Sequence, residues 1–275
     1  MKFVSYQPYV VETETSKTLY FDSIHVQSAM SKGDPNELRL GYTHVMMSFL
    51  LLHPEPLDIL IVGLGGGSLS KYCHHLLPNA RITTVEISRD VIGLRDIFCI
   101  PQDNDFFKIV HANAVDYLHD KMQIADVILL DGYDEIGLPK ELRTAGFYAN
   151  CHKALRKGGI LVANIHGDNV RIDTCNRRMK QVFDGEVLWA NAILSGNQIA
   201  FALKQVSRQP LEVLKQRAHN LRQQTTLPFP RFLDLMWDSA RSVSNGYNWL
   251  EELPKSPEFD QLEDIPDMGC STISI

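Results

Sequence analysis

The segment from Ile59 to Gly67 reads Ile-Leu-Ile-Val-Gly-Leu-Gly-Gly-Gly. Its first four residues are apolar, which suits a strand that is buried on both faces, as in a parallel sheet. The glycines that follow allow the backbone to turn sharply and to approach a ligand closely. Residues 68–77 have a helical pattern, so the N-terminus of that helix would face the same ligand.

A second apolar stretch, residues 81–87, leads to an acidic residue, Glu86. An acid at the end of the second strand, about 20 residues after the glycines, is typical of a site that holds the ribose of a nucleoside. Strand, glycine turn, helix, strand and acid in this order predict a nucleoside-binding site. The alternative is a tight turn that binds no ligand.

The rest of the chain continues to alternate between strands and helices. We expect strands at residues 59–62, 81–87, 108–110, 125–130 and 160–164, and an antiparallel hairpin at 187–192 and 198–204. We expect helices at residues 37–52, 68–77, 90–98, 115–119 and 144–155. This alternation predicts an α/β fold, a doubly wound, Rossmann-like and mostly parallel sheet whose site lies at the carboxyl ends of the strands.

The two ends of the chain differ in texture from this central part. Residues 1–35 are expected to form a small β cap, with a hairpin at 9–13 and 18–22 and a third strand at 23–28. Residues 36–206 would form the Rossmann-like domain. Residues 207–275 would form a helical C-terminal extension, with helices at 211–224 and 231–243, and we assign no chemistry to it.

Composition and charge limit the classes of partner. The net charge of −6 argues against a nucleic-acid partner, and the chain has no apolar run of about 18 residues that could cross a membrane. The N-terminus lacks the apolar core of a signal peptide. The five cysteines are scattered and form no Cys-x-x-Cys pair, which is typical of reduced thiols in a cytoplasmic protein. No spacing of histidines and acids indicates a metal site.

Two further loops carry side chains that suit a nucleoside and an amine. Asn113 and Ala114 follow the third strand, where a side-chain carbonyl can accept from an adenine amino group. Asp131 and Asp134 follow the fourth strand, and paired carboxylates there can hold or deprotonate an amine. The structural alternatives are a plain turn residue at Asn113, a cap at Asp131 and a solvated loop acid at Asp134.

The order of these motifs resembles the polyamine aminopropyltransferases, the spermidine and spermine synthases, over about residues 4–205. The glycine loop and Glu86 are shared with all class I S-adenosylmethionine-dependent methyltransferases. The β cap and the Asp-x-x-Asp loop are more particular to the synthases. The other matching motifs are Tyr6-Gln7, Tyr42, Ile136 to Pro139, Phe147-Tyr148 and Lys157-Gly158-Gly159.

The resemblance implies transfer of an aminopropyl group from decarboxylated S-adenosylmethionine to a small cationic amine, by a cytoplasmic homodimer that uses no metal. Asp134 matches the acid that takes the proton, with Asp131 and Tyr42 beside it. The donor, or S-adenosylmethionine itself, would be bound by Gly63, Gly65, Gly66, Gly67, Glu86, Asn113, Ala114 and Asp131. The amine would be bound by Gln7, Gln27, Tyr42 and Tyr133.

The chain departs from the family pattern in the amine half of this site. Gly66 stands where the synthases have an aspartate that binds the aminopropyl end of the donor, a charged hydrogen bond worth on the order of 1.5–3 kcal/mol. Thr43-His44 replaces a His-Glu pair. Asn113 replaces an aspartate, and Tyr133 is bulkier than the small residue usual there.

Three other functions remain open at this point. An S-adenosylmethionine-dependent methyltransferase would use the same fold, and Gly66 could leave room for the carboxylate end of its donor. A non-catalytic nucleoside-binding or scaffold protein would need none of the acids. A NAD-dependent dehydrogenase fits less well, because the glycine spacing is atypical.

Overall fold

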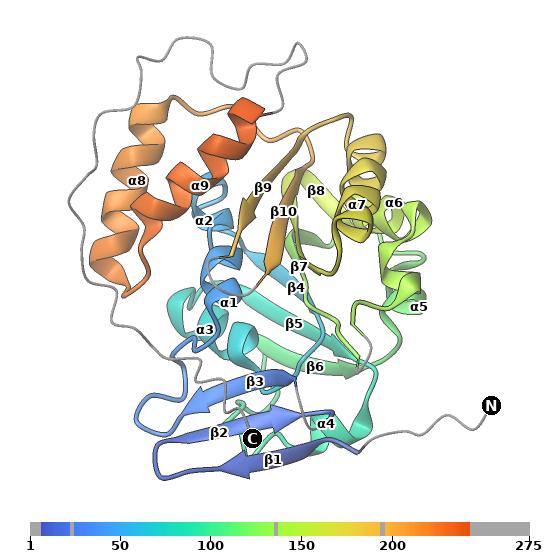
Figure 1. Cartoon of the computed structure of the whole chain (residues 1–275), viewed down its shortest axis with the longest axis vertical. Coiled ribbons are helices and arrows are strands. Elements are labelled where there is room, and N and C mark those ends of the chain that lie inside the picture. The colour runs from blue at the N-terminus through green and yellow to red at the C-terminus, as the bar shows by residue number, and fades with distance from the viewer. Residues whose placement is uncertain (1–6, 23–24, 135–136, 193–195, 243–275) are drawn as a thin grey trace.

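A computed structural model describes residues 7–22, 25–134, 137–192 and 196–242 of this chain (Figure 1). Its main sheet has seven strands in the order β6-β5-β4-β7-β8-β10-β9. The parallel strands are β4 (Asp58–Val62), β5 (Arg81–Glu86), β6 (Phe107–His111), β7 (Ala125–Leu130) and β8 (Leu155–His166). Two antiparallel strands, β9 (Val187–Asn191) and β10 (Asn197–Leu203), complete one edge. The predicted fold class and the C-terminal hairpin are therefore confirmed.

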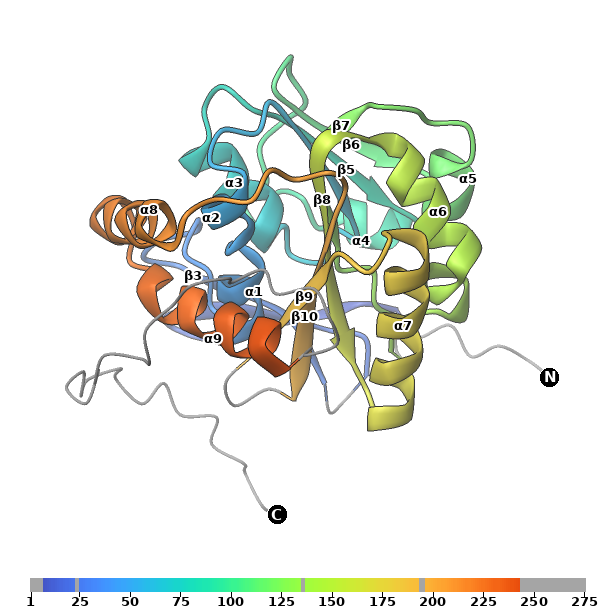
Figure 2. The same ribbon diagram turned by 90° about the horizontal axis from the view of Figure 1, so that it is seen from above.

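Helices cover both faces of this sheet (Figure 2). One face carries α1 (Gly41–Met46), α2 (Phe49–Leu52), α3 (Ser68–Leu76) and, farther along the chain, α8 (Leu211–Gln224) and α9 (Phe229–Ser242). The other face carries α5 (Ala114–Leu118), α6 (Ala145–Ala154) and α7 (Asn169–Val182). The central strands are buried on both sides, which explains why their sequences are continuous apolar runs.

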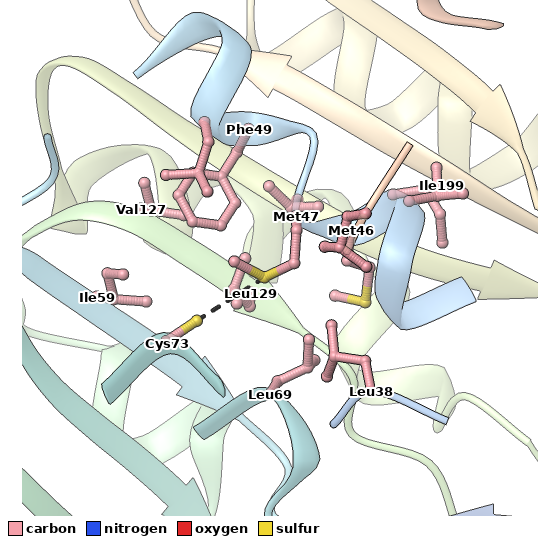
Figure 3. Packing of buried hydrophobic residues seen from close by; sticks show 14 of the residues in the cluster. Leu38, Met46, Met47, Phe49, Ile59, Leu69, Cys73, Val127, Leu129 and Ile199 are labelled. Carbon is pink, nitrogen blue, oxygen red and sulfur yellow. Dashed lines mark hydrogen bonds between the residues drawn. The ribbon is translucent and has the colours of Figure 1, made fainter. Parts of the chain in front are cut away.

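Figure 3 shows the core on the first of these faces. Phe49 of α2 packs against Val127 and Leu129 of the sheet, and Cys73 of α3 donates a weak hydrogen bond to the sulfur of Met47 at 3.9 Å. Met46 and Met47 are fully buried here, as expected for packing residues. The core fixes α3, and with it the glycine loop that leads into α3.

Helices α8 and α9 belong to the same core. Leu214 and Leu221 of α8 and Phe229 and Phe232 of α9 are buried in the cluster that covers this face of the sheet. Both helices were expected from the sequence, and α8 begins and ends where it was predicted. The predicted end of the second helix at Val243, and the rest of the tail, lie outside the described residues.

The N-terminal cap is a separate antiparallel sheet of β1 (Tyr9–Glu12), β2 (Ser16–Tyr20) and β3 (Val26–Ser31). The predicted hairpin is confirmed, while the third strand begins at Val26 rather than Ser23. Ser28 of β3 lies 3.1 Å from Ser68, oxygen to oxygen, at the start of α3. The cap therefore covers the glycine loop.

Two predicted helices were wrong in length. The segment 37–52 is not one helix. Between α1 and α2, the amides of Met47, Ser48 and Leu50 donate to the carbonyl oxygens three residues earlier, as in a 3-10 helix. The helix expected at 90–98 is a short α4 (Arg89–Gly93), and the chain beyond it turns so that Phe98 is fully buried. In both places the burial of side chains overrides the local helical pattern.

Two elements were not predicted. A 3-10 turn, η1 (Lys140–Arg143), precedes α6, and α7 occupies a stretch so polar that its periodicity is weak. Only Cys175 and Met179 of α7 are fully buried. The signal that marks its start is Asp168, whose carboxylate accepts from the Arg171 amide and caps the helix.

Candidate functional site

The carboxyl ends of β4, β5, β6 and β7 meet at one edge of the sheet, and the predicted site residues follow them. Gly63 joins two of these loops. Its φ is +96°, and a Cβ atom there would lie 2.3 Å from the main-chain oxygen of Asp131 and 2.9 Å from Cα of Gly132. Only glycine allows this contact, so the glycine loop and the acidic loop pack directly against each other.

Two main-chain amides donate hydrogen bonds to the carboxylate of Glu86. Its side chain is buried, Oε2 accepts from the Leu64 amide and Oε1 from the Ser88 amide, both at 2.8 Å. Each carboxylate oxygen can accept a second hydrogen bond. The residue therefore supports the glycine loop and retains acceptor capacity for two ribose hydroxyls.

Gly66 is enclosed by neighbouring side chains. A Cβ atom there would lie 2.7 Å from Oγ of Ser28 and 2.9 Å from Cδ1 of Phe98. Lys71, which is buried on α3, donates from Nζ to the carbonyl oxygen of Phe98 at 2.6 Å and helps to hold that ring. The space of the family aspartate is thus filled by Phe98 and Ser28, and it does not provide the free room that the sequence suggested for a larger donor.

Asn113 caps the helix that follows it. Its Oδ1 accepts from the Val115 amide at 2.8 Å, as an N-cap residue does. Ala114 is buried as the first residue of α5. The turn-residue alternative therefore describes the structural role of Asn113, and a second lone pair of the same oxygen remains for a ligand.

Ile87 is a candidate that the sequence reasoning did not select. It follows Glu86, and its side chain is 65% exposed although it is large and apolar. An exposed apolar side chain beside a ribose-binding acid can pack on the flat face of a base. The signal in the sequence was the apolar residue directly after the acid.

Asp131 is the centre of the acidic loop. Its Oδ2 accepts from the Tyr42 hydroxyl at 3.0 Å and its Oδ1 from the Asn164 side-chain amide at 2.8 Å. Burial raises the pKa of the Asp131 carboxyl to about 6, and these two hydrogen bonds oppose part of that rise. The hydrogen bond places two of the expected site residues, Tyr42 and Asp131, side by side, and burial likewise raises the pKa of Tyr42 well above its usual value.

Asn164 and Asn197 extend this network, and neither was predicted. Asn164 is 2% exposed, and its Oδ1 accepts from the Asn197 side chain at 2.8 Å. Hydrogen bonds therefore connect Tyr42 of α1, Asp131 after β7, Asn164 of β8 and Asn197 of β10. A polar residue inside the apolar run 160–165 was the available signal.

Tyr133 and Asp134 mainly organise the loop. The Tyr133 hydroxyl donates to the Asn164 carbonyl at 3.0 Å and accepts from the His166 amide at 2.8 Å, so β8 occupies it. Burial raises the pKa of this hydroxyl. Oδ1 of Asp134 accepts from the Gly137 amide at 2.9 Å. Residues 135–136 lie outside the described part of the chain.

Both predicted glutamines lie in the cap. Gln7 is exposed before β1, and Gln27 is the extra residue of an irregularity in the pairing of β2 with β3. Within the described ranges no hydrogen bond joins either glutamine to Tyr42 or Asp131. The structure thus brings together the glycine loop, Glu86, Tyr42 and Asp131, and leaves the glutamines at its margin.

Neither a metal site nor a membrane-crossing element occurs in the part of the chain that the structure describes. No group of three histidines, cysteines or acids there could hold an ion. The described helices are too short or too polar to cross a bilayer. The free cysteines Cys73, Cys151 and Cys175 are buried, and Cys99 is exposed.

Comparisons with known proteins were made against this geometry. The spermine/spermidine synthase domain model matches residues 40–209. A polyamine aminopropyltransferase from Chromobacterium violaceum is 34% identical over 227 residues, which is 82% of this chain and 87% of that protein. One from Neisseria meningitidis serogroup B is 34% identical over 240 residues, 86% and 90% of the two chains.

Solved structures agree in fold. A probable spermidine synthase from Corynebacterium glutamicum has a TM-score of 0.65 at 20% identity, covering 77% of this chain and 83% of its own. A spermidine synthase in complex with the transition-state analogue AdoDATO has a TM-score of 0.58 at 19% identity, covering 83% and 84%. Human methyltransferase-like protein 13 has a TM-score of 0.56 at 24% identity, covering 67% and 88%.

Proposed function

This chain belongs to the spermine/spermidine synthase family, and we propose that it transfers an aminopropyl group from decarboxylated S-adenosylmethionine to a diamine or polyamine. The family match covers the main-sheet part of the site, from Tyr42 to the hairpin after Asn164, and not the cap. The curated relatives that match most of its length are named polyamine aminopropyltransferases. It is an enzyme of the transferase class.

The reaction joins the amine nitrogen to the carbon beside the donor's sulfonium. As the new carbon–nitrogen bond forms, the carbon–sulfur bond breaks and its electron pair stays on sulfur, so that methylthioadenosine leaves. The attacking amine must be neutral at nitrogen, although free diamines are cationic in water. The protein must therefore attract a cation, take one proton and align the nitrogen with the carbon–sulfur bond.

The observation that carries the proposal is the environment of Asp131. Its carboxyl lies after β7, partly buried, with hydrogen bonds from Tyr42 and Asn164 that hold it in one orientation. A carboxyl whose pKa is about 6 is ionised near neutral pH and attracts an amine. We assign Asp131 and Tyr42 to orienting the amine, and Asp134 of the same loop to taking its proton.

The donor would lie across the glycine loop. Glu86 would accept from the ribose hydroxyls, Ile87 would pack on the base, and Asn113 with Ala114 would border its amino edge. The free acceptor capacity of Glu86 and the exposure of Ile87 support this placement. The cap strand β3 would close over the loop from the side of Ser28.

Gly66 bears on which donor the protein binds, S-adenosylmethionine or its decarboxylated form. The position offers no carboxylate for the donor's ammonium, and Phe98 and Ser28 exclude a side chain there. We propose that the decarboxylated donor is still used, because the enclosed space does not favour the larger carboxylated end of S-adenosylmethionine. The alternative function is that of a methyltransferase. A comparison of the two donors would favour it if the protein prefers S-adenosylmethionine.

We further propose that the protein acts in the cytoplasm as a homodimer. The cap presents apolar side chains to solvent, since Tyr9, Val11 and Val26 are each more than 40% exposed. An exposed apolar patch on an edge sheet suits association with a second copy. Light scattering after gel filtration should give twice the monomer mass of 31.2 kDa.

The test of function is methylthioadenosine release from the decarboxylated donor and putrescine. Wild type should turn over, and Asp131→Asn and Asp134→Asn should each lose at least about tenfold of kcat/KM. Asp120→Asn is the matched control, because that carboxylate is 93% exposed and lies outside the site. No turnover with putrescine, spermidine or other diamines would contradict the proposal.

A further inference from the structure

A cavity of about 640 Å³ lies on the other side of the acidic loop, between η1, the start of α6 and α7. Figures 1 and 2 both show α6 and α7 side by side there. Its lining contains no residue of the glycine loop, of the end of β5 or of the Asp131 network. The lining residues are Lys140, Glu141, Arg143, Thr144, Asp168, Val170, Arg171, Thr174, Cys175 and Arg178.

The charge of this lining is opposite to that of the chain. Four of its side chains are cationic and two are acidic, although the protein as a whole carries a net charge of −6. Both acids already have structural roles. Asp168 caps α7 by accepting from the Arg171 amide, and Glu141 lies 4.0 Å from the Lys140 ammonium. Neither acid therefore neutralises an arginine of the lining.

Within the described ranges, three arginines of the lining form no ion pair. Among the described residues, no carboxylate lies within 4.0 Å of the guanidinium of Arg143, Arg171 or Arg178. Nε of Arg143 is buried and has no hydrogen-bond partner among the residues that the structure describes. A buried donor without an acceptor is unfavourable, because it has given up its hydrogen bonds to water. The guanidinium charges of the lining are therefore not paired within the described part of the chain.

Two of the arginines lie against neighbouring segments of the chain. Arg178 donates from Nη1 to the main-chain carbonyl oxygen of Arg143 at 2.7 Å, which fixes its side chain against η1. Arg171 lies against the loop, with Nη1 3.2 Å from where a Cβ of Gly137 would be. The N-termini of α6 and α7 add their partial positive charge to the same cavity.

We propose that this cavity is a binding site for a small phosphate-bearing polyanion. Guanidinium groups present paired N–H donors that match the oxygens of phosphate, and they remain charged at all physiological pH values. The volume is larger than a single phosphate needs, which suits a diphosphate or a phosphorylated metabolite. The site differs in kind from the transfer site, whose proposed acceptor is a cation.

The test is binding of inorganic pyrophosphate, measured by titration calorimetry and by the thermal unfolding midpoint at constant ionic strength. Potassium chloride keeps the ionic strength equal, because screening alone changes the interactions of exposed charges. Wild type should bind, and the unfolding midpoint should rise with pyrophosphate concentration. Citrate is the comparison that separates phosphate from polycarboxylate recognition.

Variants of α7 locate the site. Arg171→Gln and Arg178→Gln should each weaken pyrophosphate binding by about tenfold or more, since each removes a charged hydrogen-bond donor. Arg177→Gln removes the same charge from the same helix but lies outside the cavity lining, so it should bind like wild type. The side chain of Arg171 makes no hydrogen bond with described residues, so its replacement should leave the fold intact.

Three results would overturn the proposal. One is no binding of pyrophosphate to wild type beyond the effect of salt. A second is equal affinity in wild type, Arg171→Gln and Arg178→Gln, or an equal loss in Arg177→Gln. A third is citrate binding as tightly as pyrophosphate, which would contradict the phosphate assignment. These outcomes do not depend on aminopropyl transfer, because binding is measured without either substrate.

Discussion

The hydroxyl of Tyr42 donates to Oδ2 of Asp131 at 3.0 Å, across 89 residues of sequence. This hydrogen bond connects a helix that precedes the first strand of the main sheet to the loop that follows its fourth. It favours the ionised carboxyl and therefore lowers the pKa of Asp131 against the effect of burial. The pKa of the acid that we assign to the amine is thus lowered by a residue outside its own loop.

Tyr42→Phe tests this relationship. The pKa of Asp131 should rise above about 6, because a hydrogen bond to its charged form is removed. The acid limb of kcat/KM against pH should move to higher pH, with a loss of about tenfold at neutral pH. The control is Tyr117→Phe, a half-buried tyrosine of α5 that lies outside the Asp131 network. An acid limb at the same pH in wild type and Tyr42→Phe would contradict the assignment.

Asp131 should also make stability depend on pH. Its pKa is about 6 in the folded protein and about 3.8 when unfolded, so the folded state binds more protons between these values. The contribution of Asp131 to the free energy of unfolding is therefore largest below about pH 4. It is lost as pH rises through about 6, and the loss reaches about 3 kcal/mol. Relative to wild type, Asp131→Asn should gain stability over this interval, as measured by urea unfolding. A constant difference from pH 4 to pH 7 would show that the pKa is not raised.

Gly66→Ala tests the packing around the glycine loop. The added Cβ would lie 2.7 Å from Oγ of Ser28 and 2.9 Å from the Phe98 ring, so we expect a loss of about 1–3 kcal/mol in unfolding free energy. Phe98→Ala in the same chain should recover part of that loss in a double-mutant cycle. Gly93→Ala is the control, because no atom lies within 4 Å of a Cβ there. Equal effects of Gly66→Ala and Gly93→Ala would refute the predicted collision.

Asn164→Leu removes the connection between Asp131 and Asn197. It leaves two polar side chains without their partner inside the protein, at a cost of about 2–4 kcal/mol in stability. It should also raise the pKa of Asp131 and lower kcat at neutral pH. Asn169→Leu, at an exposed position, is the control. Chemical denaturation and the pH profile together measure both effects.

The fold, and the placement of the glycine loop beside Glu86, could be predicted from local sequence. The apolar run before Gly63 and the acid at Glu86 lie within one strand–helix–strand unit, where local patterns suffice. By contrast, Asn164 and Asn197 act through contacts between neighbouring strands, and the local sequence does not show which strands are neighbours. The space at Gly66 depends on Phe98. The local pattern predicts Phe98 in a helix, whereas in the structure it follows α4 and its side chain is buried in the core.

The arginine-lined cavity was missed for a related reason. The polar stretch that forms α7 has little periodicity, and its arginines resemble those of any solvated helix face. Only the placement of α7 against η1 brings Arg143 and Arg178 together. The sequence shows the residues, while the absence of ion pairs to them within the described ranges is a property of the folded chain.

The most direct test of the account is the identity of the product formed from putrescine, read by mass spectrometry. Wild type should convert putrescine to spermidine with the decarboxylated donor, release one methylthioadenosine for each spermidine, and show little turnover with S-adenosylmethionine. Formation of a methylated amine and adenosylhomocysteine from S-adenosylmethionine, with no spermidine from the decarboxylated donor, would contradict the account.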